Sequence, residues 1–296
     1  MTNPLLTQQL PAFSKITPEL VVPTIEQLLT HNREKIAQLA EQTTPIWLSL
    51  PAQLEELDDT LSKAWSLVSH LNAVTNSPAW RDAYNQCLAK ISAYYTEIGQ
   101  NSNLYQSYQH LADSADFEQL STAQQQTIKN ALRDFKLSGV ALADDKKQRF
   151  AEIEERLSAL SAKFADNLLD ATQAWHKPLT EAELQGLPDA HQGLLAQLAQ
   201  QRGLTGHVAT LDIPAYLAVM TYADNRAFRQ EIYTAYVTRA SELSADGKFD
   251  NSPLMADILS LRYEQAQLLG YDNYAQLSLV PKMASSVDVV MQFLQE

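Results

Sequence analysis

Cysteine is almost absent from this 296-residue sequence, which contains one, Cys87. A single thiol cannot close an internal disulfide or supply a multi-thiolate metal site, so packing alone must hold the fold together. This composition is typical of a reducing compartment, and we expect a cytoplasmic protein. Cys87 lies in a run with helical periodicity, where a small buried side chain is expected rather than a reactive nucleophile.

Positive charge is also scarce, with 22 Lys and Arg against 35 Asp and Glu and a formal net charge of −13. Nucleic acids and anionic lipid surfaces are bound through a concentrated positive field, so neither is expected as a partner. Apolar runs extend over only a few residues, whereas a membrane-spanning helix needs about 20. The first residues show no basic segment followed by an apolar one, so no signal peptide is expected.

Glycine is rare, with 8 residues in the chain, while helix-favouring residues are abundant. This balance predicts a mostly α fold. Helix starts are marked by a capping residue followed by proline at Thr17-Pro18, Ser77-Pro78 and Ser252-Pro253. Pro23 is expected to restart the first helix, and Ser121 with Gln124 has the pattern of a capping box.

Two segments depart from the helical pattern. A long helix is expected from about Ala143 to Asp170, after which residues 172–188 contain several breaks and favour an extended chain. The segment His207 to Ile213 is rich in β-branched residues and is a second extended candidate, so the two segments are predicted to pair as a small β-ribbon. The sequence thus divides into a helical region at 1–171, a partly extended connection at 172–213 and a helical region at 214–296.

The end of the sequence is abrupt. Ser285 has the position of an N-cap with Asp288 at the third helical position, and an apolar pattern then begins and stops at Glu296. A natural chain end is one explanation, but an amphipathic helix pattern that stops before it is complete favours a truncated chain. We therefore expect the sequence to be part of a longer protein.

Familiar catalytic motifs are missing from the sequence. A helical zinc hydrolase needs two histidines four residues apart with a glutamate beside the first, and this pattern does not occur. The adjacent acidic pairs point about 100° apart on a helix and do not converge on one substrate. No phosphate-binding glycine loop is present. The six histidines are far apart in the sequence: His31, His70, His110, His176, His191 and His207.

The stretch from Tyr216 to Arg239 is rich in tyrosine and arginine. Its spacing places Tyr233, Tyr236 and Arg239 on a shared helical side, and such a surface can line a peptide groove because tyrosine offers area and arginine binds carboxylates or carbonyls. Core tyrosines with arginines that extend toward solvent are the alternative explanation. These three residues are the candidate contacts for a substrate; no catalytic residue and no metal ligand is predicted.

Several segments carry a resemblance to a known family. The segments are Asn130 to Phe135, Leu211 to Pro214, Asp250 to Pro253, Ile258 to Arg262, Ala266 to Tyr271 and Lys282 to Ala284. Together with matches along the rest of the chain, they resemble the zinc oligopeptidases of the thimet oligopeptidase family.

The resemblance implies the N-terminal helical lobe of a two-lobed peptidase with a deep channel, one zinc ion and action on short peptides in the cytoplasm. The family's zinc ligands and transition-state residues lie downstream of the matched region, so none is assigned to this sequence. This segment would form channel wall, with Tyr233, Tyr236 and Arg239 on the channel side, and its partners would be short peptides and the missing C-terminal catalytic lobe. The alternative is a stand-alone, non-catalytic helical binding or scaffold module.

Overall fold

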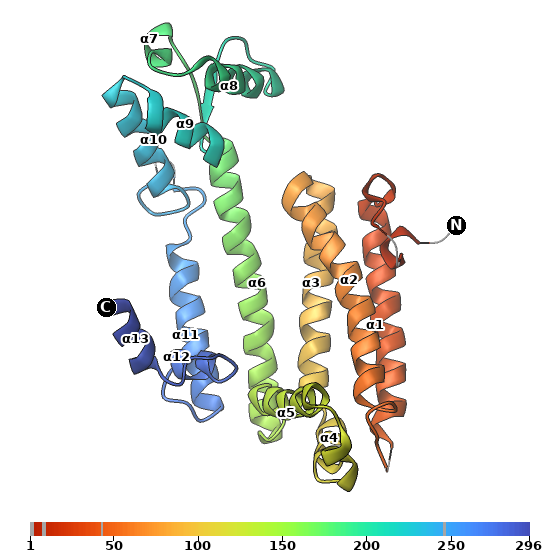
Figure 1. Cartoon of the computed structure of the whole chain (residues 1–296). Helices are drawn as coiled ribbons and strands as arrows, with labels where there is room; N and C mark the ends of the chain where they lie inside the picture. The colour runs from red at the N-terminus through yellow and green to blue at the C-terminus, as the bar shows by residue number, and fades with distance from the viewer. Residues whose placement is uncertain (1–2, 8–9, 43, 245–246) are drawn as a thin grey trace. The chain divides into compact units, whose positions relative to one another are not determined.

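The computed structural model describes residues 3–7, 10–42, 44–244 and 247–296, and they fold mainly as helices (Figure 1). The chain forms two compact units, the first made of residues 1–159 and 261–296 and the second of residues 160–260. The mostly α fold class predicted from the sequence is confirmed. The three-part division at 171/172 and 213/214 stays a prediction.

The first unit contains a helical bundle. In Figure 1 the long helices α1, α2 and α3 lie side by side, and all three pairs are in contact. Their shared core buries side chains such as Val21, Leu61 and Ile91. The elements of the bundle are η1 (Pro4–Leu6), η2 (Phe13–Lys15), α1 (Pro18–Ala40), α2 (Pro51–Thr75), α3 (Pro78–Gly99), α4 (Ser102–Ala112), η3 (Ala115–Gln119) and α5 (Thr122–Leu137).

A buried polar contact links the three long helices. The amide nitrogen of Asn32, on α1, donates to the hydroxyl of Tyr94 on α3 at 3.2 Å and to the carbonyl of Leu57 on α2 at 3.3 Å. Asn32 and Tyr94 are almost fully buried. Because a buried amide without partners is costly, this contact fixes the register of α1 against both neighbours.

Two further helices, α6 (Asp144–Ala174) and α11 (Ser252–Leu268), contribute residues to both units. Within the first unit, Arg149 makes a two-pronged ion pair with Glu264, with nitrogen–oxygen distances of 2.6 and 2.8 Å. The side chain of Gln265 donates to Glu154, and burial raises the pKa of that carboxyl above its usual value. The ends of the two helices that belong to this unit are therefore joined by two polar contacts.

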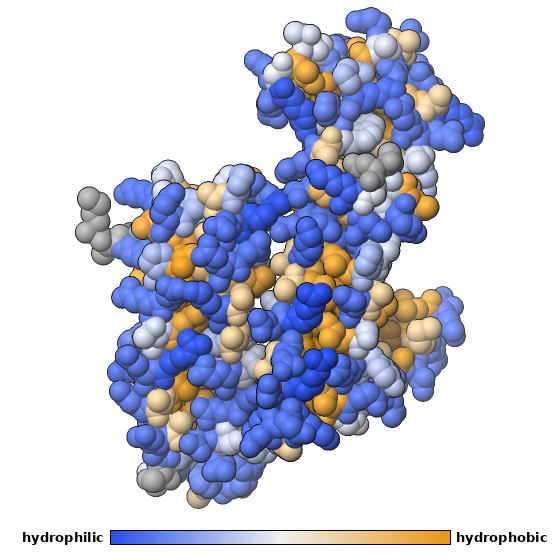
Figure 2. All heavy atoms as spheres, turned by 180° about the vertical axis from the view of Figure 1, so that it is seen from behind, coloured by the Kyte–Doolittle hydropathy of each residue, from blue (hydrophilic) through white to orange (hydrophobic). Residues whose placement is uncertain are grey.

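The first unit ends with α12 (Tyr274–Leu279) and α13 (Val287–Gln295). No residue of α13 is buried, and its apolar side chains form an orange patch on the face shown in Figure 2. The exposed members are Val289, Met291, Phe293 and Leu294. No described helix is long and apolar enough to cross a membrane.

Most helix starts lie where the sequence predicts them. The Ser77 side chain accepts from the Trp80 amide, and the capping box of Ser121 and Gln124 is formed in both directions. Cys87 is fully buried, and burial raises the pKa of its thiol to about 11, which agrees with a packing role. A thiol with this pKa is almost entirely protonated at neutral pH and is a poor nucleophile.

Two predicted helix starts are wrong. Pro23 does not restart a helix but lies inside α1. Pro23 lies near the helix start and has no N–H to donate to the carbonyl of Glu19, four residues earlier. Because Glu19 is exposed, water can donate to that carbonyl instead. The cap of α13 is Ser286 rather than Ser285, and its hydroxyl accepts from the Val289 amide at 3.2 Å. Adjacent serines are equivalent as caps in the sequence, so the choice depends on the preceding chain.

The second unit combines short helices with a two-stranded ribbon. Strands β1 and β2 are antiparallel, with Lys177 opposite Ala209. The predicted ribbon is confirmed, although β1 is shorter than expected because α6 continues to Ala174. The elements are β1 (His176–Pro178), α7 (Glu181–Leu184), α8 (Asp189–Gln201), β2 (Val208–Thr210), α9 (Ile213–Tyr222) and α10 (Arg226–Thr238). Their core includes Leu195, Leu211, Val219, Phe228 and Ile232.

Gly186 follows α7 at a point where no side chain fits. Its φ is +86°, and a Cβ there would lie 2.3 Å from the carbonyl oxygen of Tyr222 and 2.8 Å from the Asp224 carboxyl. The amide of Asp224 donates to the carbonyl of Gln185 at 2.9 Å, which holds the two backbones together. Gly203 also has a positive φ, +69°, but a Cβ there meets nothing within 4 Å.

We expect Gly186→Ala to lower the unfolding free energy of the second unit by about 2–4 kcal/mol, because left-handed strain adds to a backbone overlap. The matched control, Gly203→Ala, has the strain without the overlap and should lose only about 1–2 kcal/mol. Hydrogen exchange of amides in residues 160–260 measures both losses. Equal losses in the two variants would show that the contact with Tyr222 relaxes at little cost.

Candidate functional site

Helix α10 presents the residues that the sequence singles out. It begins at an Asn225 cap, whose side chain accepts from the Phe228 amide at 3.1 Å. Phe228 and Ile232 are buried and fix one side of the helix in the core of the second unit. Because side chains on a helix follow a 3.6-residue period, residues on its other sides remain available at the surface.

A stack of three side chains forms where α10 packs on α9. The rings of Tyr216 and Tyr236 are stacked with centroids 4.0 Å apart, and the guanidinium carbon of Arg239 lies 3.6 Å from the centroid of the Tyr236 ring. We call Tyr216, Tyr236 and Arg239 the tyrosine–arginine stack. Tyr233 lies one helical turn before Tyr236 and is 50% exposed.

The pKa of Tyr216 is raised above its ordinary value. Burial raises its pKa, the nearby phenols of Tyr233 and Tyr236 raise it further, and the guanidinium of Arg239 acts in the opposite direction. The ring stack places Tyr216 beside Tyr236, and Tyr233 lies one turn before Tyr236 on α10. The structure therefore brings Tyr236 and Arg239 into contact and adds Tyr216 from another helix.

The residue that follows Arg239 is hydrogen-bonded to one of a buried pair of asparagines. That residue, Ala240, has a φ of +52°, and its carbonyl accepts from the Asn251 amide at 3.0 Å. The Asn251 side chain accepts from the Asn167 amide at 2.9 Å and donates to the Phe164 carbonyl at 3.1 Å. We call Asn167 and Asn251 the asparagine clamp; it anchors the chain just after α10 to α6.

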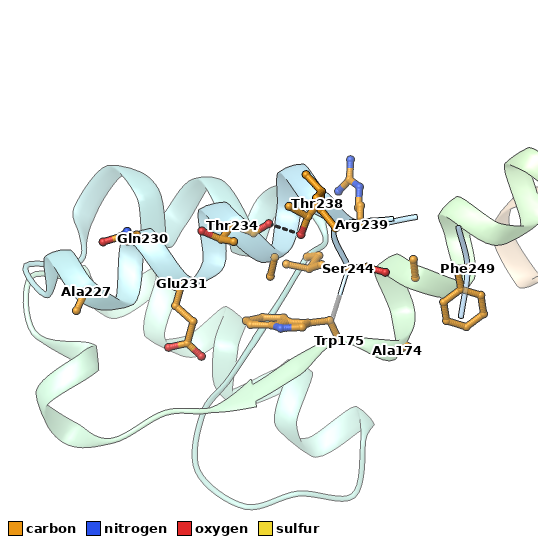
Figure 3. A pocket seen from close by; sticks show the side chains of 14 residues that line it. Ala174, Trp175, Ala227, Gln230, Glu231, Thr234, Thr238, Arg239, Ser244 and Phe249 are labelled. Carbon is orange, nitrogen blue, oxygen red and sulfur yellow. Dashed lines mark hydrogen bonds between the residues drawn. The ribbon is translucent and has the colours of Figure 1, made fainter. Parts of the chain in front are cut away.

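A hollow of about 640 Å³ lies on a second side of α10. Figure 3 shows the indole of Trp175 below the helix, Phe249 at one end, and the guanidinium of Arg239 at the rim, directed away from Trp175. Eight of the fourteen lining residues are apolar and six are polar or charged, so the hollow offers both apolar area and hydrogen-bonding groups. Its residues are Ala171, Ala174, Trp175, Leu211, Ala227, Gln230, Glu231, Thr234, Ala235, Thr238, Arg239, Leu243, Ser244 and Phe249.

An ion cluster stands beside the hollow. The Lys177 ammonium pairs with Glu231 and, at 2.9 Å, with Glu183, and it lies 5.4 Å from the centroid of the Phe228 ring. The hydrogen bond to Glu231 raises the pKa of Lys177. Burial acts to raise the pKa of Glu183, but the Thr180 backbone amide and Lys177 together hold it below its usual value. Glu231 is therefore already paired with a cation.

The sequence alone identifies some of the residues around α10 but not all of them. Tyr236 and Arg239 are in direct contact, and Tyr233 lies one turn away on the same helix. Tyr216 belongs to the stretch noticed in the sequence, but its ring contact joins residues twenty positions apart on different helices, which helical spacing does not reveal. Trp175 and Glu231 carry no motif that would mark them. That Tyr233, Tyr236 and Arg239 face a substrate channel stays a prediction.

The described residues contain no group of three or more histidine, cysteine, aspartate or glutamate side chains that could hold a metal ion. The donor set that a zinc ion requires is three or four such side chains converging on one point. The described residues thus do not supply a set of ligands for a zinc ion.

Comparison with known families finds two matches. Residues 25–147 match the neurolysin and thimet oligopeptidase N-terminal domain, and residues 219–296 match peptidase family M3. The two matched segments include most of the first unit's bundle and all of α10.

Three oligopeptidases align with 96% or more of this chain. Oligopeptidase A of Escherichia coli is 48% identical over 300 aligned positions, which include 100% of this chain and 44% of the relative. Oligopeptidase A of Haemophilus influenzae is also 48% identical, over 99% of this chain and 44% of the relative. A probable cytosolic oligopeptidase A of Arabidopsis thaliana is 38% identical over 96% of the chain. The chain thus spans less than half of the length of these relatives.

The asparagine clamp is open to a direct test. We expect Asn251→Ala to lower the unfolding free energy of the second unit by about 1–3 kcal/mol, because the buried amide of Asn167 loses its acceptor. The Asn167→Ala, Asn251→Ala double variant should lose less than the sum of the two single variants, since it leaves no amide unpaired. Hydrogen exchange in residues 160–260 provides the readout, and strictly additive losses would show that the two side chains are not coupled.

Proposed function

We propose that this chain, which belongs by sequence to the M3 peptidase family of neurolysin and thimet oligopeptidase, is the N-terminal part of a zinc-dependent oligopeptidase. In this proposal the whole protein is a metalloendopeptidase of the cytoplasm that hydrolyses short peptides inside a channel. The residues of this chain form part of the channel wall. The zinc ligands belong to a C-terminal catalytic lobe.

The structural observation that supports this proposal is the tyrosine–arginine stack. A half-buried arginine over a tyrosine ring, next to a mainly apolar hollow, offers hydrogen-bond donors and flat apolar area to a peptide. Identity of 48% with oligopeptidase A along the whole chain supports peptides as the ligand class. The relatives' names describe an activity that this chain would share only as part of a longer protein.

The part assigned to this chain is binding and shielding. Tyr233, Tyr236 and Arg239 would contact the peptide backbone or its charged groups, while the packed helices around them exclude bulk water and folded proteins from the channel. Zinc, when bound by the catalytic lobe, supplies an activated water. None of the described residues is assigned to that step.

We expect the purified 296-residue chain to fold and yet to hydrolyse no peptide, with or without added zinc, because no described cluster can hold the metal. A quenched fluorescent peptide library, read before and after chelation, measures this. Zinc-dependent cleavage by the purified chain would contradict the proposal. The intact mass of the native gene product decides the alternative: a protein that ends at Glu296 favours a non-catalytic helical binding or scaffold module.

In the longer protein, we expect alanine substitution of Tyr233, Tyr236 or Arg239 to raise KM about 3- to 10-fold with little change in kcat. A contact made equally in the ground state and the transition state has this effect. Arg226→Ala, at the exposed start of the same helix, is the matched control and should leave KM unchanged. Unchanged KM values in all three tyrosine and arginine variants would remove these residues from the channel.

A further inference from the structure

The guanidinium of Arg239 has no carboxylate partner among the described residues. By contrast, Arg33 pairs with Glu97 and Arg149 pairs with Glu264. Of the two described acidic side chains nearest to it in the sequence, Glu231 is paired with Lys177, and Glu242 accepts from the Ser252 hydroxyl at 2.7 Å. Within the described residues, Arg239 therefore contacts an aromatic ring and no carboxylate.

The stack holds this cation in a defined orientation. With its carbon 3.6 Å from the centroid of the Tyr236 ring, the guanidinium rests on the ring, and Tyr216 supports that ring from its own helix at 4.0 Å. A stacked guanidinium keeps its N–H groups available, and it loses less side-chain freedom on binding than a free one. Its two-pronged donor edge matches the geometry of a carboxylate.

Three phenols lie on the two packed helices α9 and α10. Tyr216, Tyr233 and Tyr236 make no side-chain hydrogen bond in the part of the chain that the structure describes. Tyr216 and Tyr236 belong to the stack, and Tyr233 lies one turn before Tyr236. An ionised carboxylate accepts hydrogen bonds only, on about four lone-pair sites. A guanidinium with phenol hydroxyls near it is complementary to that group.

We propose that Arg239, with Tyr216, Tyr233 and Tyr236, forms a binding site for a carboxylate of a peptide ligand. The carboxylate is either the free C-terminus or an aspartate or glutamate side chain. This inference rests on the proposed function for its ligand class, peptides. It goes further because it names the chemical group that the site selects.

The test uses the 296-residue chain and four fluorescein-labelled pentapeptides built on alanine. One has a free C-terminus, one is amidated, one is amidated with a central glutamate, and one is amidated with a central glutamine. Fluorescence anisotropy titrations give the Kd of each. We expect at least one carboxylate peptide to bind about 10-fold more tightly than its neutral counterpart. The free-acid pair and the glutamate pair separate the two sources of the carboxylate.

Substitutions test whether the preference for carboxylate peptides over neutral ones comes from Arg239 and the tyrosines around it. Arg239→Ala should reduce the preference to about one, and Arg239→Lys should keep only part of it, because lysine has the charge without the planar fork. Arg226→Ala should keep the preference. Circular dichroism confirms that each variant is folded, and Tyr236→Leu, which removes the supporting ring and keeps the arginine, should weaken the preference in its own right.

The proposal is overturned if no carboxylate peptide is preferred, or if Arg239→Ala keeps the preference. It is also overturned if Arg226→Ala loses the preference as strongly as Arg239→Ala. Because the measurement is of binding and needs no hydrolysis, it stands apart from the peptidase assay. A chain that selects carboxylates while the longer protein fails to cut peptides would reject the proposed function alone.

Discussion

The buried amide of Asn251 is the contact on which the arrangement around α10 depends. It accepts from Asn167, donates to Phe164, and through its own backbone amide holds the carbonyl of Ala240. Ala240 is held at a φ of +52°, a conformation that costs a non-glycine residue about 1–2 kcal/mol. A strained residue persists only where its surroundings compensate, and the asparagine clamp provides the compensation. Arg239 directly precedes this anchored residue, and its guanidinium lies over the ring of Tyr236.

The same unit shows how a surface group can be rigid without being buried. Arg239 is restrained on one side by the turn at Ala240 and on the other by the ring of Tyr236, which rests on Tyr216 of α9. Phe228 and Ile232 fix α10 itself in the core. Each step from core to surface is a packing contact, so the orientation of the guanidinium follows from the fold of the unit rather than from an ion pair. An ion pair would have occupied the donors that the stack leaves available.

The local features of this fold are the ones that the sequence predicts well. Capping at Ser77 and Ser121 uses hydrogen bonds within three residues, so the pattern alone reveals them. Pro23 misleads because the cost of a proline in a helix depends on whether water reaches the carbonyl it leaves unpaired, which is a property of the folded surface. Ser285 and Ser286 cannot be ranked as caps without the path of the preceding chain.

The candidate site is predictable only in part, because some of its contacts join residues that are far apart in the sequence. Tyr233, Tyr236 and Arg239 share a short segment, so helical periodicity brings them together. Tyr216 joins them through the packing of α9 on α10, and Asn167 reaches Asn251 across a sequence separation of 84. Lys177 finds Glu231 at a separation of 54. No periodicity spans such distances, so these partners become visible only in the tertiary structure.

The overall charge of the chain sets how a site of this kind must work. A net charge of −13 repels an anionic ligand at long range. At physiological ionic strength that field is screened beyond about 8 Å, so the groups within the first few ångströms decide the outcome. Attraction must then come from short, oriented hydrogen bonds to a guanidinium held in place before the ligand arrives. The restraint of Arg239 by Ala240 and Tyr236 is therefore the feature that lets an acidic protein present a selective site for an anionic group.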